Sequence, residues 1–144
     1  MKVFIQASTS LTPSPLQAEA WALLLAAKVA AALQLHQVMF LTNNLALARA
    51  AASSATDPQA LWEIRNLVSN FQHVSQMLQP KIYHITRDLN GVAHNCSQQA
   101  IRSSPSGPIF SCFSSAHTNR LCPIAIALQN SKFQGFVLHD VSCL

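Results

Sequence analysis

Short apolar runs alternate along this chain with longer segments of helical periodicity. The runs resemble β-strands bounded by polar residues, and they lie at Val3–Ile5, Gln37–Thr42 and Lys81–Thr86. In the other segments, apolar side chains recur every three or four positions, and these segments cover Ser14–Leu35, Asn44–Ala52, a stretch beginning at Thr56, and Val92–Ile101. Strands separated by helices are typical of crossover connections. The order therefore predicts an α/β fold.

Polar caps mark where the predicted helices begin. Ser14 stands at capping-box spacing from Gln17, and Pro15 would occupy the first helical position. Asn43 and Asn44 end the second apolar run and can cap the short helix that follows. The long helix has a periodic face that comprises Trp21, Leu24, Leu25, Lys28 and Ala32. In the later helix, Leu61, Ile64, Val68 and Phe71 share one side, and both Trp21 and Trp62 are predicted core residues.

The character of the chain changes at Ser103. Prolines and serines interrupt any sustained period from there onward, so residues 103–144 are predicted to form an irregular tail with one short strand at Phe133–Leu138. Residues 1–102 would then form the globular domain.

Composition excludes several classes of protein. Only 10% of the residues are charged, against about 25% in a typical soluble domain, and the net charge is +4. The longest apolar stretch, Ala20–Ala27, ends at Lys28 and is shorter than the ~20 residues of a bilayer span. No segment resembles a signal peptide, so we expect no membrane insertion and an intracellular location, nuclear or cytoplasmic. The chain has three glycines and no Gly-rich phosphate loop. No Ser or Cys lies in the Gly-flanked turn that is typical of hydrolases.

A zinc site is a further candidate. Cys112, His117 and Cys122 have the spacing of the last three ligands of a zinc knuckle, but the first ligand would fall at Ile109, which cannot bind metal. A fourth ligand could come from Cys96, His139 or Cys143. Because the chain shows no secretory signal, reduced thiols without zinc are the favoured interpretation.

Three segments together resemble a known family. Leu16–Leu23 opens a helix with an Ala-Glu pair, Phe40–Asn44 closes a strand, and His84–His94 runs from a strand through a loop into a helix. In order and spacing they resemble the ribonuclease H-like domain of plant non-LTR retroelement reverse transcriptases, over roughly Met1–Ile101. The resemblance implies a ribonuclease H-like fold, with a mixed sheet flanked by helices, that is truncated at its N-terminus and lacks its first strands.

The resemblance also implies a catalytic site. In this family, acidic side chains hold two Mg²⁺ ions that promote hydrolysis of the RNA strand of an RNA·DNA hybrid. The family positions correspond here to Glu19, Asn43 and His94, and the first aspartate would lie before Met1. Mg²⁺ prefers carboxylate oxygens, so an amide and an imidazole are poor replacements. Weak Mg²⁺ binding at Glu19 and loss of cleavage are therefore expected.

Substrate contacts follow from the same resemblance. His84 precedes His94 at the spacing of the family's catalytic-loop histidine, and Arg87 and Asn90 lie between them. A guanidinium can contact a backbone phosphate, and an Asn can contact a sugar hydroxyl of an RNA·DNA hybrid. The alternative is that Asn90 caps the following helix and Arg87 is a solvated loop residue.

Two functions from different classes remain open. The first is a nucleic-acid-binding domain of retroelement origin with a degenerate nuclease site. The second is a non-catalytic interaction module or a non-functional retroelement fragment. The absent strands would also expose a strand edge near Val3–Gln6, through which the chain could self-associate.

Overall fold

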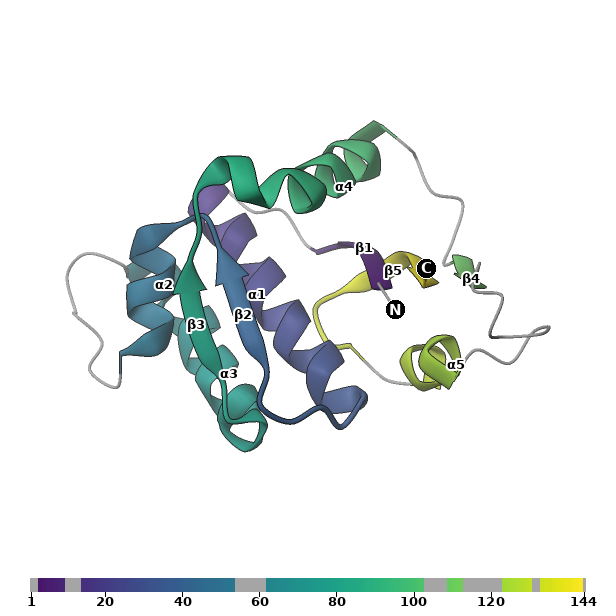
Figure 1. Ribbon diagram of the computed structural model, residues 1–144, viewed down its shortest axis with the longest axis horizontal. Helices are drawn as coiled ribbons and strands as arrows, with labels where there is room; N and C mark the ends of the chain where they lie inside the picture. Colours follow the sequence, from purple (N-terminus) through teal and green to yellow (C-terminus); the bar gives the residue numbers. More distant parts are fainter. Residues whose placement is uncertain are drawn as a thin grey trace. The chain divides into compact units, whose positions relative to one another are not determined.

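The computed structural model describes residues 3–9, 14–53, 62–102, 109–112, 123–130 and 133–143. It forms two compact units, which we call the central unit (Leu11–Asn90) and the terminal unit (Met1–Ser10 with Gly91–Leu144). Helices flank a small sheet in each unit (Figure 1), which confirms the predicted α/β class. The elements in chain order are β1 (Val3–Ser8), α1 (Pro15–Ala32), β2 (Met39–Thr42), α2 (Leu45–Ala52), η1 (Trp62–Ile64), α3 (Arg65–Ser75), η2 (Gln76–Leu78), β3 (Lys81–His84), η3 (Arg87–Asn90), α4 (Gly91–Arg102), β4 (Ile109–Cys112), α5 (Pro123–Asn130) and β5 (Val137–Cys143).

A parallel strand pair organises the central unit. β2 and β3 run side by side in a register that extends from Met39 opposite Lys81 to Thr42 opposite His84. Helices α1 and α3 pack against each other and lie behind this pair in Figure 1, while α2 contacts both strands. Because the strands are parallel, their carboxyl ends lie at the same edge of the sheet.

Helix α1 begins as predicted, but it buries a different face. The Ser14 side chain accepts a hydrogen bond from the Gln17 backbone N–H, and Pro15 is the first helical residue. Of the periodic face described from the sequence only Leu24 is buried, since the buried residues are Ala20, Leu23, Leu24, Ala27 and Ala30. The helix is apolar around most of its circumference, so periodicity could not select a face. The small alanines allow α3 to approach closely.

The core of the central unit centres on two aromatic rings. Phe40 of β2 meets Phe71 of α3 edge-to-face, with 5.2 Å between the ring centroids and 82° between the planes. Ile64, Val68 and Phe71 are buried together, as the periodicity predicted. Trp62 is 78% exposed, so its prediction as a core residue is wrong. It opens the short η1 turn, in which Ile64 takes the buried position. The predicted helix start at Thr56 and the first residue of the predicted face, Leu61, lie outside the described residues.

The terminal unit joins segments from the two ends of the chain. Its sheet has the order β1-β5-β4, with β1 antiparallel and β4 parallel to β5. β1 confirms the predicted first strand and lies at a sheet edge, while self-association through it stays a prediction. Residues 103–144, predicted as irregular with one strand, contain α5 as well as β4 and β5. These strands pair with residues distant in sequence, which local patterns do not reveal.

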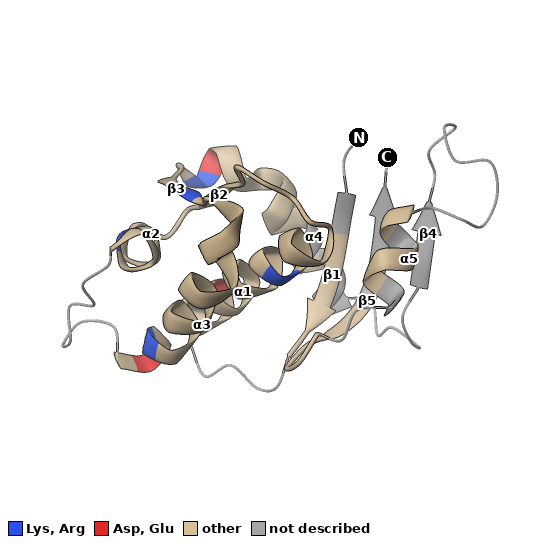
Figure 2. Ribbon diagram, turned by 90° about the horizontal axis from the view of Figure 1, so that it is seen from below, with Lys and Arg blue, Asp and Glu red and all other residues tan. Residues whose placement is uncertain are grey.

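Charged residues are few in the described part of the chain. Figure 2 shows scattered Lys, Arg, Asp and Glu positions, some adjacent and of opposite sign, on a ribbon that is mostly uncharged. Among the described helices, none combines the length and apolar character that crossing a bilayer requires.

Candidate functional site

The carboxyl ends of β2 and β3 bring several of the predicted site residues to one edge of the central unit. Asn43 follows β2, and η3 follows β3 two residues beyond His84. The Ile85 backbone N–H donates to the Thr42 carbonyl over 2.9 Å and continues the strand pairing to this edge. In open α/β sheets, ligands commonly bind at the carboxyl ends of strands.

Glu19 is held at this edge by Thr42. The buried Thr42 hydroxyl, whose residue is 5% exposed, donates to Glu19 Oε2 over 3.2 Å. The Thr42 hydroxyl oxygen, Oγ1, in turn accepts the Asn44 backbone N–H, also over 3.2 Å. Glu19 lies beyond the first turn of α1, which holds no acidic residue. Because the helix dipole acts within the first turn, it does not account for Glu19; its carboxylate is directed at the end of β2 instead.

The two consecutive asparagines have different partners. Asn44 Oδ1 accepts the Leu47 backbone N–H over 3.0 Å, which confirms the predicted cap of α2. Asn43 Oδ1 accepts a hydrogen bond from Asn90 Nδ2 over 3.2 Å. This bond joins the end of β2 to the end of η3. A helix cap would use Asn90 Oδ1, so the bond to Asn43 is compatible with the capping role.

The segment after β3 is a short helix rather than the predicted loop. η3 spans Arg87–Asn90, and the Leu89 backbone N–H donates to the Thr86 carbonyl over 3.1 Å. A 3₁₀ turn pairs backbone groups within the few residues that separate β3 from α4. Arg87 and Asp88 are both exposed, and their adjacent opposite charges leave η3 with little net charge.

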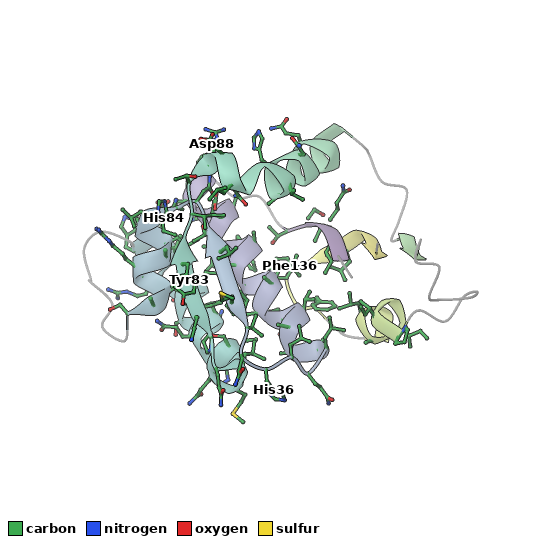
Figure 3. All side chains as sticks on the ribbon, in the orientation of Figure 1. His36, Tyr83, His84, Asp88 and Phe136 are labelled. Carbon is green, nitrogen blue, oxygen red and sulfur yellow. The ribbon has the colours of Figure 1, made fainter. Side chains whose placement is uncertain are left out.

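The remaining candidate residues are exposed. His84 lies near Asp88 at the site end of β3 in Figure 3, and His36 lies at the opposite end of the central unit. His94 is exposed on α4, in the terminal unit. The structure therefore places Glu19, through its bond to Thr42, at the end of β2 next to Asn43. A hydrogen bond connects Asn43 directly to Asn90.

The bonded residues bring one carboxylate, from Glu19, and the amide oxygens of Asn43 and Asn90 to this edge. Asp88 of η3 carries a further carboxylate, which is exposed beside Arg87. Over the described part of the chain, no three His, Cys, Asp or Glu side chains form a group that could hold a metal ion. Of the zinc candidates, the Cys112 side chain, His117 and Cys122 lie outside the residues that the structure describes.

Sequence reasoning missed Thr42, although a polar residue that ends an apolar run was a visible signal.

We expect Thr42→Val to lower the free energy of unfolding by about 1–3 kcal/mol, because Glu19 loses a donor and the Asn44 N–H loses its acceptor. Thr42→Ser keeps the hydroxyl and should cost clearly less. Urea unfolding followed by circular dichroism measures both; equal losses in the two variants would contradict a role for the hydroxyl.

A comparison with protein families gives one match. A family model described as reverse transcriptase-like covers residues 2–100 of the chain. The matched range contains Glu19, Asn43, His84, Asn90 and His94. Searches of curated proteins and of solved structures found no match.

Proposed function

Because this chain belongs to the reverse transcriptase-like family, we propose that it is a ribonuclease H-like domain of retroelement origin that binds RNA·DNA hybrids without cleaving them. One observation carries the proposal: Asn90 donates a hydrogen bond to Asn43, which the resemblance assigns to the family's strand-end acidic position. A neutral amide pair thus occupies the place where the family chemistry needs an anion.

The residues at this edge do not fit a pair of Mg²⁺ ions. Two-metal hydrolysis needs carboxylates that balance two dications and bridge them. Glu19 offers one carboxylate, and one of its oxygens already accepts the Thr42 hydroxyl. The Asn43 oxygen is neutral and accepts from Asn90. We therefore derive no cleavage step for this chain.

Hybrid binding draws on groups that need no metal. Arg87 is exposed on η3, where its guanidinium can contact a backbone phosphate. The hydrogen bond to Asn43 fixes the orientation of the Asn90 amide, and its Oδ1 can accept from a ribose 2′-hydroxyl. The net charge of +4 favours association with a polyanion only modestly.

Fluorescence anisotropy with a labelled RNA·DNA hybrid, in EDTA and at several salt concentrations, tests the proposal. We expect binding that weakens as salt rises, with preference for the hybrid over duplex DNA. Arg87→Ala should reduce the slope of log Kd against log salt by about one, because one phosphate contact is lost. Arg49→Ala is the matched control, since Arg49 is exposed in the last turn of α2, away from the site.

An exposed apolar strand face favours the second function, a non-catalytic interaction module. Met39 and Leu41 of β2 and Tyr83 of β3 are exposed, and Leu41 pairs with Tyr83 in the strand register. Such a face suits a protein partner better than a polyanion. Absence of any salt-sensitive hybrid binding would favour this function and overturn the first.

A further inference from the structure

Ser14 connects the start of α1 to η1. Its hydroxyl donates to Glu63 Oε2 over 2.9 Å and accepts the Gln17 backbone N–H over 3.2 Å. The Gln17 side-chain Nε2 donates to the Glu63 carbonyl over 3.2 Å. We call Ser14, Gln17 and Glu63 the Ser14 latch. All three side chains are half-buried, and the bond to Glu63 exists only while the Ser14 oxygen carries its proton.

Ser14 is followed by Pro15. Among the described residues it is the one Ser or Thr that precedes a proline. Its backbone is extended, with φ −139° and ψ 153°, as expected before proline, and Pro15 is exposed. An extended Ser-Pro dipeptide is the substrate that proline-directed protein kinases recognise. The dipeptide lies at a helix end, where local opening needs the least free energy.

The geometry points to Ser14 as a phosphorylation site of a proline-directed protein kinase, and phosphorylation there opens the Ser14 latch. The γ-phosphoryl group of ATP is transferred to Ser14 Oγ. The new O–P bond forms as the bond to ADP breaks, and the hydroxyl proton passes to the base of the kinase. ADP and the phosphoserine are the products.

Phosphorylation changes the balance of charges at the latch. The esterified oxygen has no proton to donate to Glu63, and the phosphate adds about −1.5 to −2 charge beside that carboxylate. The phosphate can still accept the Gln17 N–H, and the helix dipole favours it. The Gln17 N–H thus keeps an acceptor within α1, whereas Glu63 loses its donor and faces a like charge, so the bond that joins Ser14 to η1 is replaced by repulsion. The start of α1 therefore separates from η1.

Phosphorylation of the full chain by a purified mitogen-activated protein kinase with ATP tests the site. Thr12 and Ser104 also precede prolines, so they are replaced by Ala in the test protein, and tandem mass spectrometry locates the phosphate. We expect incorporation at Ser14 that falls at least about tenfold in Pro15→Ala, which keeps the hydroxyl but removes the recognised proline. Absence of phosphate at Ser14, or equal incorporation in Pro15→Ala, would overturn the assignment.

Thermal unfolding of the phosphorylated and unmodified proteins tests the latch. We expect phosphorylation to lower Tm by about 5 °C. In Glu63→Gln, which removes the negative charge but keeps the side-chain length, the shift should be at most half as large. A Tm that is unchanged or raised by phosphorylation, or an equal shift in Glu63→Gln, would refute the opening of the latch. Neither measurement depends on hybrid binding.

Discussion

Phe71→Ala is expected to lower the free energy of unfolding by about 3–5 kcal/mol, which is a large part of the total for an ordinary domain. Phe71 is 1% exposed and lies edge-to-face against Phe40, so truncation leaves a cavity between α3 and β2 and removes the aromatic contact. The surrounding helices can close such a cavity only in part, because α1 and α3 already pack against each other.

Two variants calibrate this loss. Phe71→Leu keeps most of the buried volume and should cost clearly less than Phe71→Ala. Met77 is 80% exposed, so Met77→Ala should change the free energy of unfolding by no more than about 0.5 kcal/mol. Urea unfolding at 25 °C provides all three values. A loss below about 1 kcal/mol for Phe71→Ala would show that the two rings do not form the core described above.

Asn43→Asp is expected to strengthen divalent-cation binding by about 30-fold. A second carboxylate would then stand one residue beyond Thr42, which holds Glu19. A unit charge about 4 Å from a dication in a water-like dielectric contributes roughly 2 kcal/mol, which corresponds to that change in affinity. Asn90 can still donate to the new carboxylate, so the connection to η3 is retained. Calorimetric titration with Mn²⁺ measures the change.

The matched control for this prediction is Asn70→Asp. Asn70 is exposed on α3, so the variant adds the same charge to the central unit outside the site. Its Mn²⁺ affinity should stay near that of the unmodified chain. Adding Glu19→Gln to Asn43→Asp should remove most of the gain. An equal gain in Asn70→Asp would mean that net charge, rather than the site, determines cation binding.

Local signals in the sequence predicted much of the central unit. Ser14 and Asn44 have side chains that cap helices through bonds to nearby backbone, so a short stretch of sequence is sufficient to locate them. The apolar runs that form β2 and β3 were also recognisable, because each is defined by a few consecutive residues. The inward face of α1 could not be predicted, because alanines and leucines occur on all sides of this helix. Only the position of α3 determines which of them are buried.

Contacts between distant residues could not be predicted in this way. The strand that ends the chain pairs with the strand that begins it, from Val3 opposite Cys143 to Ser8 opposite Val137. At the site, Asn43 and Asn90 were each selected from the sequence, but the hydrogen bond between them depends on the parallel register of β2 and β3. Thr42 can donate to Glu19 only because α1 lies beside the paired strands β2 and β3.

We expect the edge occupied by Glu19, Asn43 and Asn90 to bind an RNA·DNA hybrid without cleaving its RNA strand. Incubation of the purified chain with a labelled RNA·DNA hybrid in Mg²⁺ or Mn²⁺, resolved on a denaturing gel, tests it most directly. We predict no RNA cleavage above the buffer control, and the same result for Glu19→Gln. Sustained turnover by the unmodified chain that Glu19→Gln abolishes would contradict the claim.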